Sequence, residues 1–203
     1  SSDEQIEIMQ ESDQLQKEYI SYSSIASLNF SRDTKDDRAK LEKEYYDSIS
    51  PDIQEIFNDY EKAVHQSRFK DSISEKWGKT YFQKIELELK IFDPKIKDML
   101  KEEIELKNDY TKLTAGAEIE FDGKTYNLAG LGPFHNDEDR KIRKQSMEAR
   151  FKWFENNADQ FDEIYDKLVK LRHKIAQELG YENFIELGYM RMGRLDYGPS
   201  EVA

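Results

Sequence analysis

Apolar residues recur at three- and four-residue spacing along most of the chain, a pattern that predicts a mostly helical protein. Residues 4–29 carry a weak form of this pattern and are expected to form the first helix. A second helix is expected to begin at Asp33 or Thr34 and to run to about Ile49. The first part of the chain therefore predicts a series of helices packed side by side.

Later helices are marked by their start signals. Ser50-Pro51-Asp52 combines a capping residue, a proline suited to the first turn and an acid that favours the helix dipole, so it predicts a third helix. Ser72 and Glu75 have the spacing of a capping box and predict the start of a fourth helix. Asp93-Pro94 repeats the cap and proline and predicts a fifth helix, which Gly116 ends.

After Gly116 the apolar pattern alternates every second residue, over about residues 117–128. Asp122-Gly123 is a two-residue turn of the kind that closes a β-hairpin, because glycine accepts positive φ without a steric cost. Folding about it pairs Phe121 with Lys124, Ile119 with Tyr126, and Ala117 with Leu128. A lone hairpin is marginal in water, so its apolar face is expected to lie on helices or on residues outside this chain.

The rest of the chain again predicts helices. Gly130-Leu131-Gly132-Pro133 is expected to form a loop, and Asn136 to Asp139 to cap a helix with Ile142, Ser146, Ala149 and Trp153 on its inner face. Residues 159–179 give the clearest helical pattern, which Gly180 should end, and a short helix is expected from Phe184 through Met192.

These elements predict a mainly α fold, an antiparallel helical array with one small hairpin. We divide it into a helical N-terminal lobe, residues 1–115, and a second unit, residues 116–203, which the chain leaves incomplete. Gly198-Pro199-Ser200-Glu201 is a further helix-start signal with almost no chain after it. We therefore expect the sequence to be the front part of a larger protein.

Composition narrows the function classes. The formal net charge of −12, with basic residues interleaved among acids, argues against binding to nucleic acid or to a membrane surface. The chain has no cysteine, so it can form neither a disulfide nor a thiol nucleophile. Aromatic residues make up 12% of the chain, which indicates an ordered protein, and we expect it to be cytoplasmic.

The histidines do not form a recognisable metal motif. A helical zinc-peptidase site needs two histidines four residues apart with a glutamate beside the first, and none of His65, His135 and His173 begins one. Glu61 and His65 are four residues apart, which favours an exposed ion pair or a packed edge over a ligand set. The sequence therefore gives no catalytic and no metal-binding residue.

Other candidates also have simpler explanations. Glu102, Glu103 and Glu105 are typical of a solvated helix face, and no carboxylate stands alone in an apolar run that would raise its pKa. His173 is expected to be structural or exposed. Around Tyr189 to Tyr197, Arg191 and Arg194 are expected to bond terminal carbonyls or nearby acids while methionines and tyrosines pack; contact with a ligand is the alternative.

The order of three pieces in the second half is specific enough to suggest a family. These are the Asp122-Gly123 hairpin, the segment from His135 to Lys144 with its continuation to Asn157, and the segment from Arg172 to Phe184 leading into Tyr189–Tyr197. In this order they make the chain resemble the oligoendopeptidase F branch of the thimet-oligopeptidase-like zinc metallopeptidases. The helical region before Gly116 fits that family's N-terminal lobe.

The resemblance implies two mostly helical lobes that face each other across a deep channel. It also implies hydrolysis of short peptides by a zinc-activated water, with two histidines and a glutamate from an HExxH helix and a further glutamate downstream. HExxH is missing here, so no catalytic or metal residue can be carried onto this sequence. We expect zinc only in the full-length enzyme, and this portion to be an inactive wall of the channel.

A different class of protein fits the same composition. The alternative is a stand-alone acidic helical scaffold for protein–protein interaction. The next stretch of the parent gene separates the two, because an in-frame HExxH decides for the metalloendopeptidase. Substrate-binding residues stay unknown from the sequence, and apolar faces left exposed in the second unit predict some self-association.

Overall fold

The computed structural model describes residues 1–202. Its helices are α1 Ser2–Arg32, α2 Asp37–His65, α3 Lys70–Trp77, α4 Lys79–Ile91, α5 Lys97–Ala115, α6 Gly132–His135, α7 Arg140–Asn156, α8 Ala158–Glu178, α9 Phe184–Arg191 and α10 Pro199–Val202, with a 3-10 turn over Pro94–Ile96. Its strands are β1 Ile119–Phe121 and β2 Lys124–Tyr126. The predicted mainly α fold with one small hairpin is confirmed.

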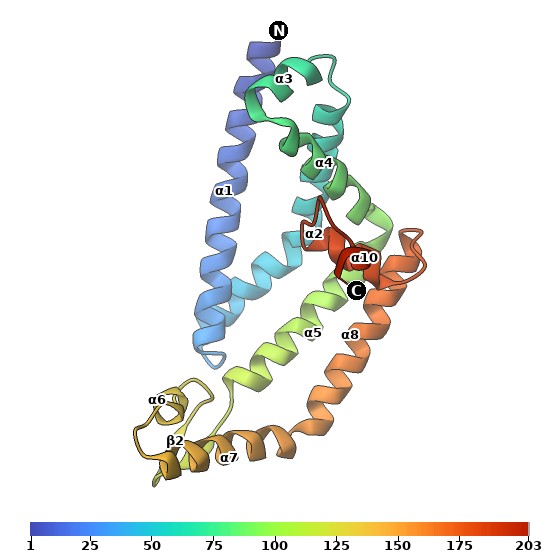
Figure 1. Ribbon diagram of the computed structural model, residues 1–203. Coiled ribbons are helices and arrows are strands. Elements are labelled where there is room, and N and C mark those ends of the chain that lie inside the picture. The colour runs from blue at the N-terminus through green and yellow to red at the C-terminus, as the bar shows by residue number, and fades with distance from the viewer. Residues whose placement is uncertain (203) are drawn as a thin grey trace.

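The helices form an open, elongated array (Figure 1). The long helix α1 runs down one side and packs on α2. The short helix α3 lies beside the start of α1, and α4 runs from α3 toward the middle of the array. From there α5 descends to the hairpin, α7 crosses the base, and α8 climbs back along α5. Finally α9 packs on α4 and α8, which brings the C-terminal segment back toward the middle of the array.

The helix α2 differs from the prediction of two shorter helices. Asp36, rather than Asp33 or Thr34, caps it by accepting hydrogen bonds from the Arg38 and Ala39 amides. The helix then continues through Pro51, so the predicted start of a third helix at Ser50 is wrong. Proline has no N–H and crowds the preceding turn, which favours a bend, and α2 changes direction partway along its length in Figure 1.

The start of the fourth helix is also displaced. Ser72 and Glu75 lie inside α3 instead of capping a helix. The break comes at Gly78, whose φ of 86° ends α3 before α4 begins. In contrast, Asp93-Pro94 is confirmed as a helix start, because the Asp93 carboxylate accepts a hydrogen bond from the Lys95 amide.

The hairpin has the predicted register, but its strands are shorter than predicted and the expected pair of Ala117 with Leu128 lies outside them. Ile119 lies opposite Tyr126 and Phe121 opposite Lys124, about the Asp122-Gly123 turn. Its apolar face packs within this chain, where Phe134 of α6 contacts both Phe121 and Tyr126 at ring-centroid distances of 5.0 and 5.2 Å. The segment expected to be a loop thus contributes the short helix α6, which covers the hairpin.

The remaining signals of the second half are confirmed. Asp139 caps α7 by accepting a hydrogen bond from the Lys141 amide, and Ser146 on its inner face is fully buried. Gly180, with a φ of 90°, follows the end of α8. Pro199 opens α10.

Two clusters of buried side chains hold the array together. One lies among α1, α2, α3 and α4 and contains Ile6, Met9, Val64, Ile73, Phe82 and Ile85. The other joins α5, α8 and α9 and contains Phe92, Ile96, Leu100, Leu106, Leu171, Ile175, Ala176 and Leu187. The division of the chain near Gly116 stays a prediction, and the second cluster draws side chains from both of its sides. None of the helices in residues 1–202 is long and apolar enough to cross a membrane.

Candidate functional site

His65 and His173 have different surroundings in the structure. The His65 Nε2 atom lies 3.1 Å from the Glu86 Oε1 atom and 3.1 Å from the Lys70 Nζ atom. Of the two predicted arrangements of Glu61 and His65, the ion pair is therefore not formed within residues 1–202, and the packed edge stays a prediction. His173 is exposed, as predicted. Within residues 1–202 no three His, Cys, Asp or Glu side chains could together hold a metal ion. The described residues therefore do not fit a zinc site, and no chemical step through zinc is assigned to them.

The most strongly organised polar group is centred on Glu103. It is only 2% exposed, so the prediction of a solvated face is wrong for this residue. Arg172 of α8 donates from Nε to Oε1 at 2.8 Å, and Arg191 of α9 donates from Nη2 to Oε2 at 2.7 Å. The Lys107 Nζ atom lies 3.3 Å from Oε1. We call Glu103, Lys107, Arg172 and Arg191 the Glu103 cluster.

Glu103 is buried because of its place on α5. It lies three residues after Leu100 and three before Leu106, so it shares their buried stripe. Burial alone would raise the pKa of its carboxyl group, but Arg191 and then Arg172 and Lys107 outweigh that effect and lower the pKa to about 2. The carboxylate is therefore charged at neutral pH and binds α5 to α8 and α9.

The segment from Tyr189 to Tyr197, at the end of α9 and after it, behaves partly as predicted: the two tyrosine rings pack on each other, but Met192 is 58% exposed. Arg191 bonds a neighbouring acid, Glu103, as expected. Arg194 instead lies over the ring of Tyr197, 5.0 Å from its centroid. One nitrogen of Arg191, Nη1, is buried without a hydrogen-bond partner among the described residues. The cluster thus holds three cations around one carboxylate, in a chain whose overall charge is strongly negative.

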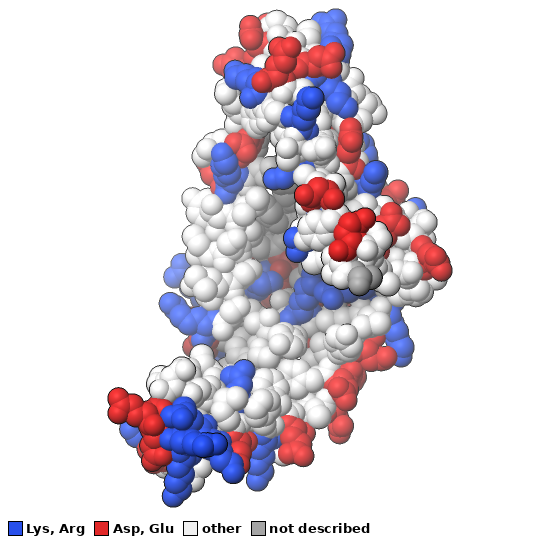
Figure 2. Space-filling view, in the orientation of Figure 1, with Lys and Arg blue, Asp and Glu red and all other residues white. Residues whose placement is uncertain are grey.

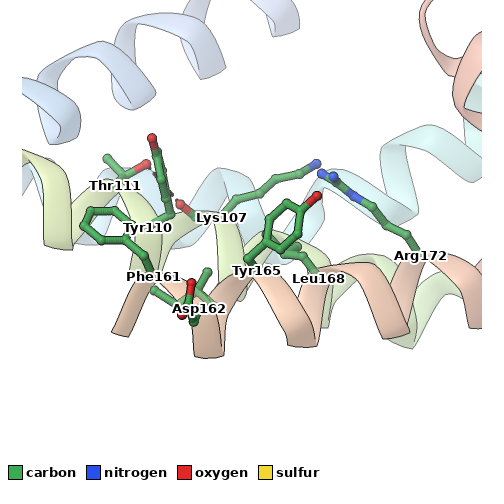
Figure 3. A pocket seen from close by; sticks show the side chains of 9 residues that line it. Lys107, Tyr110, Thr111, Phe161, Asp162, Tyr165, Leu168 and Arg172 are labelled. Atoms are coloured by element: carbon green, nitrogen blue, oxygen red, sulfur yellow. Dashed lines mark hydrogen bonds between the residues drawn. The ribbon is translucent and has the colours of Figure 1, made fainter. Parts of the chain in front are cut away.

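A groove begins at this cluster and runs between α5 and α8 (Figure 3). We call it the α5–α8 groove; its volume is about 520 Å³. It is lined by Lys107, Tyr110, Thr111, Phe161, Asp162, Ile164, Tyr165, Leu168 and Arg172. Figure 3 shows the ends of the Lys107 and Arg172 side chains turned toward each other at one end, with Tyr110 and Phe161 at the other.

The groove combines cations with exposed aromatic rings. Tyr165 is 71% exposed and Tyr110 is 50% exposed, and the Tyr110 and Phe161 rings meet edge to face at 5.8 Å. Figure 2 shows Lys and Arg side chains gathered below α10, on an otherwise largely uncharged stretch of that face. The chemistry of such a groove suits an apolar or aromatic side chain beside a carboxylate.

Comparison with known proteins shows what kind of chain this is. Residues 1–92 match the family model of the Peptidase M3 N-terminal domain. Two solved structures named as oligoendopeptidase F, one of them from Bacillus anthracis strain Ames, match 100% of the chain with TM-scores of 0.93 and 0.92 and identities of 38% and 34%. The chain is oligoendopeptidase F-like.

A structure of Pz peptidase A with an inhibitor also matches the whole oligoendopeptidase F-like chain, at a TM-score of 0.93 and 42% identity. The chain covers only 36–37% of these three structures, about a third of each. A search of the curated proteins finds no match. The likeness therefore concerns the N-terminal part of such peptidases, and the resemblance based on the hairpin and the later helices is confirmed.

Proposed function

We propose that the chain forms the N-terminal portion of a zinc-dependent oligoendopeptidase that hydrolyses short peptides. The observation that carries this proposal is the similarity to Pz peptidase A, which extends over 100% of the chain at 42% identity. In this proposal the zinc ligands and the catalytic base come from residues outside these 203. The comparisons point to peptidases rather than to the alternative, a stand-alone acidic scaffold.

The role proposed for this portion is to form one wall of the substrate channel and to limit substrate size. The open array supports it, because Figure 2 shows a hollow between α1 and α10 on the face that also carries the uncharged stretch. The α5–α8 groove supports it as well, since aromatic rings and cations can contact side chains and carboxylates of a peptide. A cytoplasmic location stays a prediction, and the net charge of −12 still argues against a nucleic-acid partner.

The chain by itself is proposed to be inactive. The test compares the purified 203-residue chain with a longer product of the same gene that includes an HExxH segment, using a quenched fluorescent peptide and added zinc. The longer protein should cleave the peptide, lose activity with a chelator and regain it with zinc, while the 203-residue chain should cleave nothing. Zinc-dependent cleavage by the 203-residue chain, or a parent gene without HExxH, would overturn the proposal.

Self-association of the chain is also part of the proposal. Large apolar side chains lie exposed after the hairpin, including Phe151 at 61%, Tyr165 at 71% and Val169 at 48%. Exposed apolar patches favour association. Sedimentation velocity should show a concentration-dependent oligomer, and a strictly monomeric chain across the accessible concentration range would contradict this.

A further inference from the structure

A second cavity, separate from the α5–α8 groove, lies between α1, α2 and α4. Its volume is about 440 Å³. Tyr19 lines it from α1, Asn58 and Glu61 from α2, and Glu88 from α4. We call it the glutamate cavity.

The carboxylates of this cavity lack ionic partners. Neither Glu61 nor Glu88 forms an ion pair within 4.0 Å in residues 1–202. Lys84 lines the same cavity but pairs with neither of them. Glu61 is half-buried, whereas Glu88 is exposed at the edge. The cavity therefore carries negative charge that the described part of the chain leaves without an ion pair.

A buried amide oxygen provides an independent sign of a missing partner. Asn58 is only 3% exposed, and its Oδ1 atom is buried with no hydrogen-bond donor among the described residues. An unsatisfied buried acceptor costs about 1–3 kcal/mol, so native structures rarely retain one without a reason. Asn58 lines the cavity together with both glutamates. The three side chains offer acceptors and negative charge, and they lack a matching donor.

The other walls favour an organic cation over a metal ion. Tyr19 and Phe57 meet at a ring-centroid distance of 6.5 Å, and Tyr81 lines the cavity from α4. The faces of aromatic rings attract ammonium groups, and apolar walls accept an alkyl chain. A metal ion would need more ligands, and residues 1–202 contain no group of three His, Cys, Asp or Glu side chains that could hold one.

We propose that the glutamate cavity binds an alkylammonium group, with Glu61 and Glu88 as counter-charges and Asn58 as a hydrogen-bond acceptor. The shared chemistry is a primary amine on an alkyl chain, which a free diamine or a lysine side chain can supply. The proposal goes beyond the proposed peptidase function and does not depend on it, because neither zinc nor catalysis takes part.

Binding should be coupled to the loss of a proton. Burial, and then the neighbouring Glu88, raise the pKa of Glu61 to about 7. An ammonium ion beside Glu61 favours its charged form, so binding should strengthen as the pH rises from 6 to 8. The other titratable or charged groups that line the cavity are Tyr19 on α1 and Tyr81, Lys84 and Glu88 on α4, and Tyr60 precedes Glu61 on α2. Burial raises the pKa values of the three tyrosines, so none of them titrates in this range.

The experiment is calorimetric titration of the 203-residue chain with 1,5-diaminopentane and, separately, with Nα-acetyl-lysine amide. Each titration is done at pH 6, 7 and 8 in two buffers of different ionisation enthalpy. At least one probe should bind, with an affinity that rises several-fold from pH 6 to 8 and with proton release at pH 7. Binding of the diamine alone indicates a free amine, and binding of the lysine derivative alone indicates a side chain.

Three variants place the site. Glu61→Gln and Glu88→Gln should each weaken binding about tenfold at pH 8, since each removes one counter-charge. Glu42→Gln changes an exposed glutamate earlier on the same helix and should leave the affinity unchanged. Circular dichroism at pH 8 checks that each variant is folded. The proposal is overturned if neither amine binds at pH 8, or if the affinity is the same in the Glu61 and Glu88 variants as in the unaltered chain.

Discussion

Glu103 on α5 and Glu61 on α2 are both shielded from water by the fold, but the charges around them differ in sign. Glu103 is surrounded by Lys107, Arg172 and Arg191, which bring its pKa down to about 2 despite burial. Glu61 forms no ion pair with a cation in residues 1–202, and burial, followed by the neighbouring Glu88, raises its pKa to about 7. Burial alone thus does not decide whether a carboxyl group is charged at neutral pH; the partners do.

The contrast also separates two uses of a buried acid. The Glu103 cluster joins three helices and fixes two cations at the end of the α5–α8 groove, so its carboxylate is already fully engaged. In the glutamate cavity, Glu61 and Glu88 form no ion pair in residues 1–202. Their protonation can therefore change with pH or when a cation binds. The first arrangement should therefore matter for stability and the second for binding.

The largest expected effect comes from removing the Glu103 charge. Glu103→Gln leaves two arginines without their carboxylate, and we expect a loss of about 3 kcal/mol in the free energy of unfolding at pH 7. Urea denaturation followed by circular dichroism measures it. Glu102→Gln, at the exposed neighbouring position, serves as the control and should change stability by less than about 0.5 kcal/mol. Equal effects at the two positions would break the comparison.

The next effect tests the arginine that contributes most to the low pKa. Arg191→Met removes a hydrogen bond of 2.7 Å to Glu103 and should cost about 2 kcal/mol. It should also raise the pKa of Glu103, which NMR titration of the side-chain carboxyl carbon detects. Arg194→Met is the matched control, because Arg194 lies over Tyr197 instead. A Glu103 pKa that stays near 2 without Arg191 would contradict the assigned cause.

The pH dependence of stability should have opposite signs at the two glutamates. The stabilisation by Glu103 is present above the unfolded pKa of about 4.5 and is lost as the pH falls toward 2. Glu61 binds its proton more tightly when folded, so its ionisation costs stability as the pH rises from about 4.5 through 7. Glu61→Gln should therefore stabilise the chain at pH 8, by about 1 kcal/mol after allowance for its partial exposure, and have little effect at pH 4.

Thermal unfolding of the Glu61 variant and the unaltered chain at pH 4 and pH 8 measures this difference. Glu42→Gln, on an exposed part of α2, should show no such change between the two pH values. If Glu61→Gln destabilises the chain at pH 8, then Glu61 has a stabilising partner and the contrast with Glu103 does not hold.

The smallest expected effect concerns the outermost cation of the cluster. Lys107 is 50% exposed and lies 3.3 Å from Glu103, so water screens the pair. Lys107→Met should lower stability by less than about 1 kcal/mol, well below the loss for Arg191→Met in the same urea experiment. A loss as large as that for Arg191 would mean that total positive charge, rather than buried hydrogen bonding, holds the cluster.

Much of the fold could be predicted because its signals are local. The Asp122-Gly123 turn fixed the hairpin register, and Asp93-Pro94 and Gly180 marked helix ends correctly. Ser50-Pro51-Asp52 gave a wrong prediction of a helix start, because proline can occur both in the first turn of a helix and at a bend inside one. Contacts from another helix keep α2 continuous there, since Tyr19 packs on Tyr46 before the proline and on Phe57 after it.

The polar sites could not be predicted, because they depend on contacts between helices that are far apart in the sequence. Glu103 looks like its exposed neighbours Glu102 and Glu105, and only its spacing from Leu100 and Leu106 hinted at burial. Its partners Arg172 and Arg191 lie 69 and 88 residues away along the chain. The raised pKa of Glu61 was missed for a similar reason, because it depends on burial in the folded array and then on Glu88 of α4.

The separation between Glu103 and Arg191 has a consequence for how the protein is made. At about 5–20 residues per second, a ribosome needs roughly 4–18 s to add the 88 residues between them. During that time α5 exists before the helices that cover it. We expect the charged Glu103, in the middle of this apolar stripe, to keep the surface hydrated and to oppose premature association until both arginines have been synthesised. The same carboxylate would then protect the growing chain first and join the helices afterwards.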